Sequence, residues 1–397
     1  MNMENSRPEE AGTLYPEETV RETVEQPAGT GAGQEEPPKK KGLLGTLKSI
    51  LENETVREII APGVVTIGGK IAYDKMFGRY ERPDYAVTPG IRTYERIADR
   101  LPRKRFTFDS DNVKCAGYFY QADRSRGLVA FAHGLHAGAD DYLPVFEFFV
   151  QNGYSVIAFD TKGTYDSEGK STVGLAEALV ELDHLLDLVK AEPSLSQLPL
   201  FVCGHSCGGG AVTSVLSLHP EIRGCTGIAA MKDPNQMIVG KGMVYSAILG
   251  LPETPLTVAF LESQQKKLFG DYTLLNGVKG INDTSCPVLL AHGIKDMVIE
   301  YISPIALINH KKELRDDNVF YYVGRGNSGA HDTIWRSSRA VDYQEQVKKE
   351  LDKRKKAKGR EWTKEDEAEF VAGVDHALYS EINRDLFEKA VETFEKA

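Results

Sequence analysis

Apolar and polar positions in the middle of the chain alternate in a strand–turn–helix order that repeats several times. Six short apolar runs end in turn residues and are typical of buried parallel strands. These runs are Leu128–His133, Tyr154–Asp160, Leu200–Gly204, Cys225–Ala230, Val288–His292 and Val319–Val323. Helical patterns separate them, and the clearest carries one apolar stripe from Leu175 to Val189. The alternation predicts a doubly wound, mostly parallel sheet flanked by helices, the α/β class.

The segments around this array predict further elements. Residues 104–110 and 113–121 read as an antiparallel hairpin that precedes the parallel strands. Residues 231–286 make a long connection rich in Met, Leu and Phe, and we expect a small helical lid insertion over the carboxyl ends of the strands. Residues 343–397 are charged and helical, with a capping box at Thr363 and Asp366. We therefore expect a main α/β domain over residues 104–342 and a C-terminal helical extension after it.

The N-terminal part of the chain has a different pattern. Residues 1–41 are rich in Glu, Gly, Pro and Thr and predict a disordered acidic tail, because they cannot bury enough apolar surface to offset the entropy of ordering. Residues 42–103 predict a helical extension, with apolar positions at helical spacing as far as Ile60. A basic flank makes Lys39–Ile60 a candidate for contact with a membrane surface. Docking on the protein's own core is the preferred alternative, because acidic residues follow that flank.

Charge and cysteine content narrow the class of protein. Most of the formal net charge of −10 lies in the first 38 residues, and the rest of the chain is close to neutral, which disfavours a nucleic-acid partner. The five cysteines are odd in number and lie in apolar stretches, so we expect reduced thiols and a cytoplasmic location. Neither a membrane span nor a secretory signal is expected.

The segment that carries the chemistry begins at the end of an apolar run. Gly204-His205-Ser206-Cys207-Gly208 follows a predicted strand directly and leads into a helix. A Gly-x-Ser-x-Gly sequence in this setting forms a tight turn that exposes the serine hydroxyl at the edge of the sheet. The sequence therefore predicts Ser206 as a nucleophile, against the alternative of a structural turn.

A serine nucleophile needs a base and an acid that orients the base, and in this architecture they follow in the order acid, then histidine. Asp296 comes just after the predicted strand that ends at His292, and His331 lies on the loop after the next strand. Both therefore stand where loops leave the carboxyl ends of strands. The alternatives are a helix cap for Asp296 and an ordinary loop histidine for His331, whereas His292 is expected to be structural.

A third loop supplies the groups that would bind the oxyanion. His133-Gly134-Leu135-His136 follows the predicted strand at 128–133. We expect the backbone N–H groups of Leu135 and Cys207 to stabilise the tetrahedral intermediate. His133 is expected to brace the loop. His136 is expected to contact the substrate, with a loop-stabilising role as the alternative.

These pieces, in this order, resemble the α/β-hydrolase superfamily, and more narrowly its serine aminopeptidase S33 and monoacylglycerol-lipase-like branch. The run from His133 to Tyr142 matches that branch at its ends, and residues 160–169 match its Asp-x-Arg-Gly-His-Gly-x-Ser-x-Gly loop without a gap. Thr164 and Tyr165 replace the His-Gly of that loop. The resemblance covers roughly residues 104–340 and implies an α/β-hydrolase fold. We also expect Tyr142 and His205, beside His136, to contact the substrate.

The function expected from these residues is hydrolysis of a carboxylic ester by a Ser–His–Asp acyl-enzyme mechanism. No cofactor or metal is expected, because no ligand spacing for zinc and no phosphate-binding loop occurs. A serine aminopeptidase or amidase is the first alternative, and it would need acids such as Glu253 or Glu262 to hold a substrate ammonium group. A non-catalytic binding protein on the same scaffold is a further alternative. The expected partner is a small ester.

Overall fold

The computed structural model describes residues 71, 73–248, 255–315 and 317–397. The expected acidic tail, the apolar pattern up to Ile60 and the candidate membrane segment Lys39–Ile60 therefore lie outside the described residues. So does Glu253. Among the described helices, none is long and apolar enough to cross a membrane.

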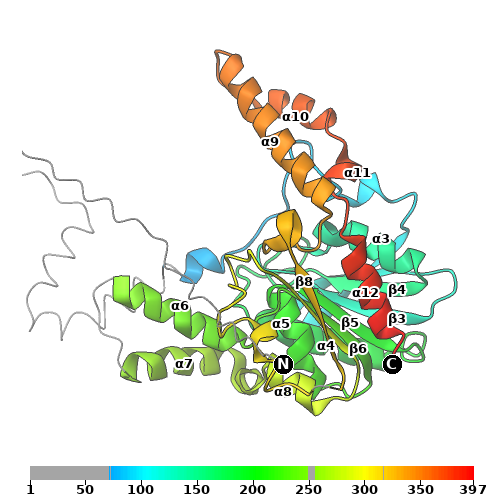
Figure 1. Cartoon of the computed structure of the whole chain (residues 1–397), viewed down its shortest axis with the longest axis vertical. Helices are drawn as coiled ribbons and strands as arrows, with labels where there is room; N and C mark the ends of the chain where they lie inside the picture. Colours follow the sequence, from blue (N-terminus) through cyan, green and yellow to red (C-terminus); the bar gives the residue numbers. More distant parts are fainter. Residues whose placement is uncertain (1–70, 72, 249–254, 316) are drawn as a thin grey trace, which may run out of the picture. The chain divides into compact units, whose positions relative to one another are not determined.

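The centre of the molecule is an eight-stranded sheet in the order β1-β2-β4-β3-β5-β6-β7-β8 (Figure 1). The strands are β1 (Arg103–Ser110), β2 (Val113–Tyr120), β3 (Gly127–Ala132), β4 (Tyr154–Phe159), β5 (Leu200–His205), β6 (Ile222–Ile228), β7 (Val288–Gly293) and β8 (Val319–Gly324). β1 and β2 form the predicted antiparallel hairpin, and β2 pairs antiparallel with β4. All other neighbours are parallel. This is the sheet of the α/β-hydrolase fold, as predicted.

Helices cover both faces of the sheet, which is why β3, β4, β5 and β7 are buried at every position. One face carries α4 (Glu177–Ala191), α5 (Cys207–Ser214) and α8 (Gly277–Asp283), and the other carries α3 (Leu143–Gln151) and α12 (Arg384–Phe394). α4 contains the apolar stripe predicted from the sequence. Because every parallel strand ends at the same edge, the loops that follow β3, β5, β7 and β8 gather there.

The connection between β6 and β7 consists of a pair of helices and a third helix that packs elsewhere. Its helices α6 (Pro234–Ile248) and α7 (Pro255–Phe269) pack against each other, as Figure 1 shows in green. The third helix, α8, instead packs on α5 so closely that a Cβ at Gly280 would lie 1.9 Å from the carbonyl oxygen of Thr213. α8 is therefore a crossover helix of the sheet. A lid role for α6 and α7 stays a prediction, while the packing of α8 on α5 removes that helix from the expected lid at 231–286.

The two expected helical extensions also differ from the pattern in detail. The C-terminal part is helical, with α9 (Ser338–Ala357), α10 (Lys364–Ala372) and α11 (His376–Tyr379) before α12. Thr363 and Asp366 form the predicted capping box. Leu386, Phe387 and Phe394 of α12 are buried in the core of the sheet, so this helix belongs to the α/β layer. Residues 77–102, in contrast, are mostly loop with one short 3-10 turn, Tyr94–Arg96.

Candidate active site

Ser206 lies in a sharp turn between β5 and α5. Its backbone has φ 58° and ψ −119°, a conformation that costs energy in any residue but glycine. The turn fits because glycines surround it: a Cβ at Gly208 would lie 2.1 Å from the carbonyl oxygen of Ala132, and one at Gly204 would lie 2.4 Å from that of Gly208. The N–H of Ser206 donates to the carbonyl of Ile228 over 2.9 Å. The predicted Gly-x-Ser-x-Gly turn is thus required by backbone packing.

The three residues predicted for catalysis form a hydrogen-bonded chain. Nε2 of His331 lies 2.9 Å from Oγ of Ser206, and Nδ1 of His331 lies 2.7 Å from Oδ2 of Asp296. All three residues are buried. An ionised carboxylate can only accept, so Nδ1 carries the ring proton and Nε2 has a lone pair directed at the serine hydroxyl. This arrangement can take up the serine proton.

The carboxylate of Asp296 has more partners than His331 alone. Its Oδ1 accepts from the N–H groups of Val298 and Ile299, each over 2.8 Å. Burial by itself would raise the pKa of Asp296, but hydrogen bonds from His292, His331 and the backbone hold that pKa well below its ordinary value. The carboxylate therefore stays ionised when His331 takes up a proton.

His292 supplies one of these bonds, a contact beyond the structural role expected from the sequence. Its Nε2 lies 3.2 Å from Oδ2 of Asp296 and 2.8 Å from the carbonyl oxygen of Ile299. The sequence offered one indication of this contact: His292 lies at the end of β7, four residues before Asp296. A histidine there can reach the loop that carries the carboxylate.

The two N–H groups expected to bind the oxyanion belong to Leu135, in the loop after β3, and to Cys207, the first residue of α5. Cys207 begins α5, where the first N–H groups of a helix have no intrahelical acceptor. Burial raises the pKa of the Cys207 thiol to about 12, and the N–H of Leu135 acts on this thiol in the opposite direction. The thiol is protonated at neutral pH, which suits packing rather than chemistry. The role of the two N–H groups stays a prediction.

Tyr142 and His205, expected to contact the substrate, use their polar atoms inside the protein. Nε2–H of His205 donates to the carbonyl oxygen of His331 over 3.0 Å, and Nδ1 of His205 accepts from the Tyr142 hydroxyl over 2.9 Å. The same hydroxyl accepts from the N–H of Gly134 over 3.3 Å. The two side chains thus join the loops that carry the oxyanion groups and His331. Substrate contact stays a prediction for them.

The two histidines of the loop after β3, His133 and His136, also form hydrogen bonds within the protein. Nε2 of His133 accepts from the N–H of Thr161 over 2.9 Å, and its Nδ1 lies 2.7 Å from the carbonyl oxygen of Gly134. It braces two loops, as expected. His136 is exposed, and its Nε2–H donates to the carbonyl oxygen of Met76 over 2.7 Å. This bond fits the loop-stabilising alternative, while contact with a substrate stays a prediction.

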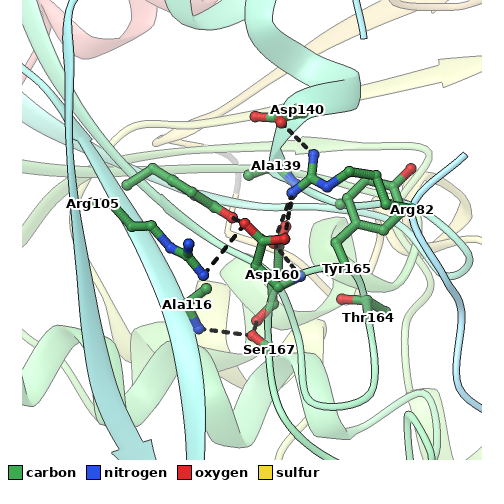
Figure 2. A network of polar contacts seen from close by, with 12 residues as sticks. Arg82, Arg105, Ala116, Ala139, Asp140, Asp160, Thr164, Tyr165 and Ser167 are labelled. Carbon is green, nitrogen blue, oxygen red and sulfur yellow. Dashed lines mark hydrogen bonds and ion pairs between the residues drawn. The ribbon is translucent and has the colours of Figure 1, made fainter. Parts of the chain in front are cut away.

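The loop at residues 160–169 is held by a buried polar network, part of which Figure 2 shows. Asp160 accepts from the N–H of Ala139 and the hydroxyl of Tyr118, each over 2.8 Å, and burial raises its pKa to about 6. Arg82 pairs with Asp140, and its guanidinium lies 4.7 Å from the centre of the Tyr165 ring. The network fixes this loop against the one that follows β3.

Thr164 and Tyr165, which replace the His-Gly of the family loop, contact a segment that lies before the region similar to the family. Tyr80 exchanges backbone hydrogen bonds with this loop: its N–H donates to Gly163, and its carbonyl accepts from Tyr165. The Tyr165 hydroxyl donates to Oδ2 of Asp141 over 2.7 Å. Tyrosine in place of glycine therefore connects the loop to residue 141, which borders the site.

Ser206 and His331 face a cavity of about 530 Å³. Part of its wall is apolar and comes from the β6–β7 connection, with Met231, Met237 and Ile238. Segments outside the resemblance also contribute, and they include Met76, Tyr80 and Arg92 before β1 and Gln344 and Tyr379 after β8. No motif indicated these residues, because they reach the cavity only through long-range packing.

Within the described part of the chain, one group of side chains could hold a metal ion: His205, His331 and Asp332. Both ring nitrogens of His331 already bond Ser206 and Asp296, and those of His205 bond Tyr142 and the His331 carbonyl. Of the three side chains, only Asp332 takes no part in these hydrogen bonds. These residues are a poor fit for a metal, because binding would break the chain of hydrogen bonds to Ser206.

Comparison with known proteins finds a matching family and several similar proteins. Residues 123–264 match the family described as serine aminopeptidase, S33. Lysophosphatidylserine lipase ABHD12 of Xenopus tropicalis is 25% identical over 224 residues, which is 53% of this chain and 54% of that protein. Quorum-quenching protein AidA of Acinetobacter baumannii is 29% identical over 110 residues, 26% of this chain and 36% of that protein. The chain thus spans about half, or less, of the curated relatives it matches.

Among solved structures, the esterase Pf2001 of Pyrococcus furiosus has 21% sequence identity and a TM-score of 0.45, covering 66% of this chain and 95% of that one. The family match, the order of the strands and the Ser206 turn support the α/β-hydrolase fold and a resemblance to its serine aminopeptidase S33 branch.

Proposed function

We propose that this protein is a carboxylic ester hydrolase that acts through an acyl-enzyme on Ser206. The observation that carries the proposal is the hydrogen-bonded chain from Ser206 through His331 to Asp296. The expected Ser–His–Asp set has the contacts that general-base activation of a serine requires.

The mechanism has two steps. His331 takes the proton of Ser206 at Nε2 as Oγ attacks the ester carbonyl, and Asp296 stabilises the resulting imidazolium. The N–H groups of Leu135 and Cys207 bind the oxyanion. His331 then gives its proton to the leaving alcohol. Water, activated by the same imidazole, hydrolyses the acyl-serine and restores the enzyme.

The character of the cavity favours an ester over a peptide with a free amino group. An aminopeptidase needs acids to hold the substrate ammonium, but Glu262 lies exposed on α7 and does not line the cavity. Two other acids, Asp141 and Asp332, do line it, but three cationic side chains share that lining and oppose an ammonium group. The cavity has an apolar wall at Met231, Met237 and Ile238, which suits an acyl chain. One relative is named lysophosphatidylserine lipase.

Labelling and substrate assays test the proposal. The purified full chain is treated with a fluorophosphonate probe and assayed on p-nitrophenyl esters of graded chain length, beside aminoacyl p-nitroanilides. We expect labelling of the wild type, none of Ser206→Ala, and ester turnover well above anilide turnover. Absent labelling, or equal labelling of Ser206→Ala, contradicts a serine nucleophile and leaves the non-catalytic alternative. Faster anilide turnover would favour the peptidase.

Two further expectations remain proposals. The five cysteines are free and buried, which supports a cytoplasmic location. Contact with a membrane surface through Lys39–Ile60 is tested by liposome flotation of the full chain and of a chain without residues 1–60. Unchanged flotation would discard that contact.

A further inference from the structure

A buried arginine in the cavity wall has no hydrogen-bond acceptor for part of its guanidinium. Arg336 is 6% exposed and lines the same cavity as Ser206. Its Nη1 is buried and has no partner among the described residues. The guanidinium carbon lies 4.0 Å from the centre of the Trp335 ring, a contact that supplies no hydrogen-bond acceptor for Nη1. Burial lowers the pKa of Arg336 to about 10, so the group is still charged at neutral pH.

A second arginine lies in the same wall and is only partly neutralised. Nε of Arg92 lies 3.4 Å from Oδ1 of Asp141, without the geometry of a hydrogen bond. Oδ2 of Asp141 is already used by the N–H of Gly138 and the hydroxyl of Tyr165. Asp141 therefore faces Arg92, and no hydrogen bond links it to Arg336.

The charges around the cavity favour an anion. Its lining contains three cationic side chains, Arg92, Lys241 and Arg336, and two acidic ones, Asp141 and Asp332. Lys241 and Asp332 are exposed, so water screens them, whereas Arg336 is shielded. A buried guanidinium nitrogen without an acceptor is costly, because the loss of its hydration is not offset by a hydrogen bond. Such a group is understandable where a ligand of opposite charge completes the site.

We propose that the substrate is an anionic ester, one whose acyl or alcohol part carries a carboxylate or phosphate group that binds the guanidinium of Arg336 while the ester lies at Ser206. This inference rests on the proposed ester hydrolysis and adds the class of substrate. A guanidinium binds either anion through two parallel hydrogen bonds, and Arg92 adds a second positive charge to the same wall.

Paired substrates of matched size test the proposal and separate the possible sources of charge. For an anion on the acyl side, mono-p-nitrophenyl glutarate is compared with p-nitrophenyl valerate. For a phosphate on the alcohol side, monobutyrylglycerol phosphate is compared with monobutyrylglycerol. We expect the anionic member of at least one pair to have a kcat/KM about tenfold or more above its neutral partner, the gain typical of a charge-assisted hydrogen bond.

Variants at position 336 test whether the preference for the anionic ester depends on Arg336. Arg336→Met should lower kcat/KM for the preferred anionic ester about 30-fold and for its neutral partner no more than about twofold, with Arg336→Lys in between. Lys349→Met removes one charge from exposed α9 and should leave the ratio unchanged. Equal rates within both wild-type pairs, or an equal loss on both members in Arg336→Met, overturn the proposal.

A binding measurement keeps the anion site separate from the chemistry. The Ser206→Ala protein is melted with and without glutarate and inorganic phosphate, beside the Ser206→Ala, Arg336→Met double variant. We expect at least one anion to raise the Tm of the first protein and not that of the second. If this shift occurs but no ester is cleaved, the anion site stands and the proposed function fails. If neither anion shifts the first protein, or both proteins shift equally, the anion site is refuted.

Discussion

Two walls of one cavity contrast in how their polar groups are satisfied. The catalytic wall, formed by Ser206, His331 and the groups that support them, is a closed set of hydrogen bonds in which both ring nitrogens of His331 are engaged. The arginine wall, formed by Arg92 and Arg336, leaves a buried guanidinium nitrogen without an acceptor. The difference teaches that the two walls have different tasks. Side chains that hydrogen-bond one another within the protein indicate the type of reaction. A buried polar group that has no hydrogen-bond partner in the protein indicates the kind of ligand that would bind there.

Removing the nucleophile should give the largest effect, confined to the catalytic wall. Ser206→Ala is expected to lower kcat about ten-thousand-fold or more, because the hydroxyl is the attacking group. Anion binding, measured by the shift in Tm, should persist. The exposed Ser194→Ala is the matched control and should retain full activity. If Ser206→Ala also lost anion binding, the two walls would not be separate.

His205 predicts a pH dependence of stability. Burial and the nearby His331 lower its pKa to about 4, against about 6.5 for an unfolded chain. Between these values the unfolded state binds the extra proton, so stability rises with pH in this window. His205 should therefore cost on the order of 3 kcal/mol of unfolding free energy between about pH 7 and pH 4. Urea unfolding of wild type and His205→Asn measures it, and the variant should show a flatter profile.

His219 is a control of opposite sign, remote from both walls. Burial opposes its charge, but hydrogen bonds to Asp183 and Glu221 prevail and raise its pKa. Its contribution is full below about pH 6.5 and disappears as pH rises through the folded-state pKa. The destabilisation caused by His219→Asn should thus shrink as pH rises. If the destabilisation caused by His205→Asn also shrank as pH rises, burial would not be the cause of the lowered pKa of His205.

His292 tests whether the catalytic wall depends on bonds beyond the three reacting residues. His292→Gln should lower kcat about tenfold with KM nearly unchanged, because a hydrogen bond to the Asp296 carboxylate is lost. An unchanged kcat together with a lower Tm would leave His292 with a purely structural role.

Arg92 should have a smaller effect than Arg336 within the arginine wall. Its side chain is 34% exposed and faces Asp141, so solvent and a carboxylate already weaken its field. Arg92→Met should lower kcat/KM on the preferred anionic ester about three- to fivefold. Parallel assays on the neutral partner should show no change. A loss as large as that of Arg336→Met would make Arg92 the principal anion ligand.

The smallest effect is expected at Tyr165, where the chain departs from the family loop. Tyr165→Phe removes the hydroxyl that binds Asp141 and frees that carboxylate to compete for Arg92. We expect a loss of about 1 kcal/mol in unfolding free energy and of about twofold in preference for the anionic ester. Denaturant unfolding and the paired assay measure the two quantities. A larger preference for the anion would contradict this link between the loop and the wall.

The sequence by itself determined the sheet and the catalytic wall. Each reacting residue follows an apolar run that forms a parallel strand, and such strands place the loops at their carboxyl ends at one edge. Local pattern and chain order were therefore enough to bring Ser206, Asp296 and His331 together.

The tertiary structure alone decided the rest. The roles of His292 and Arg336, the packing of α8 on α5 and the burial of α12 all depend on contacts that local patterns do not record. Arg92 lies near Asp141 because the segment before β1 contacts the loop that follows β3, where His136 also donates to the carbonyl oxygen of Met76. A side chain's burial, and whether its polar atoms find partners, depend on segments distant in the sequence. This is why the sequence predicts the type of reaction and only the folded cavity indicates the charge of the substrate.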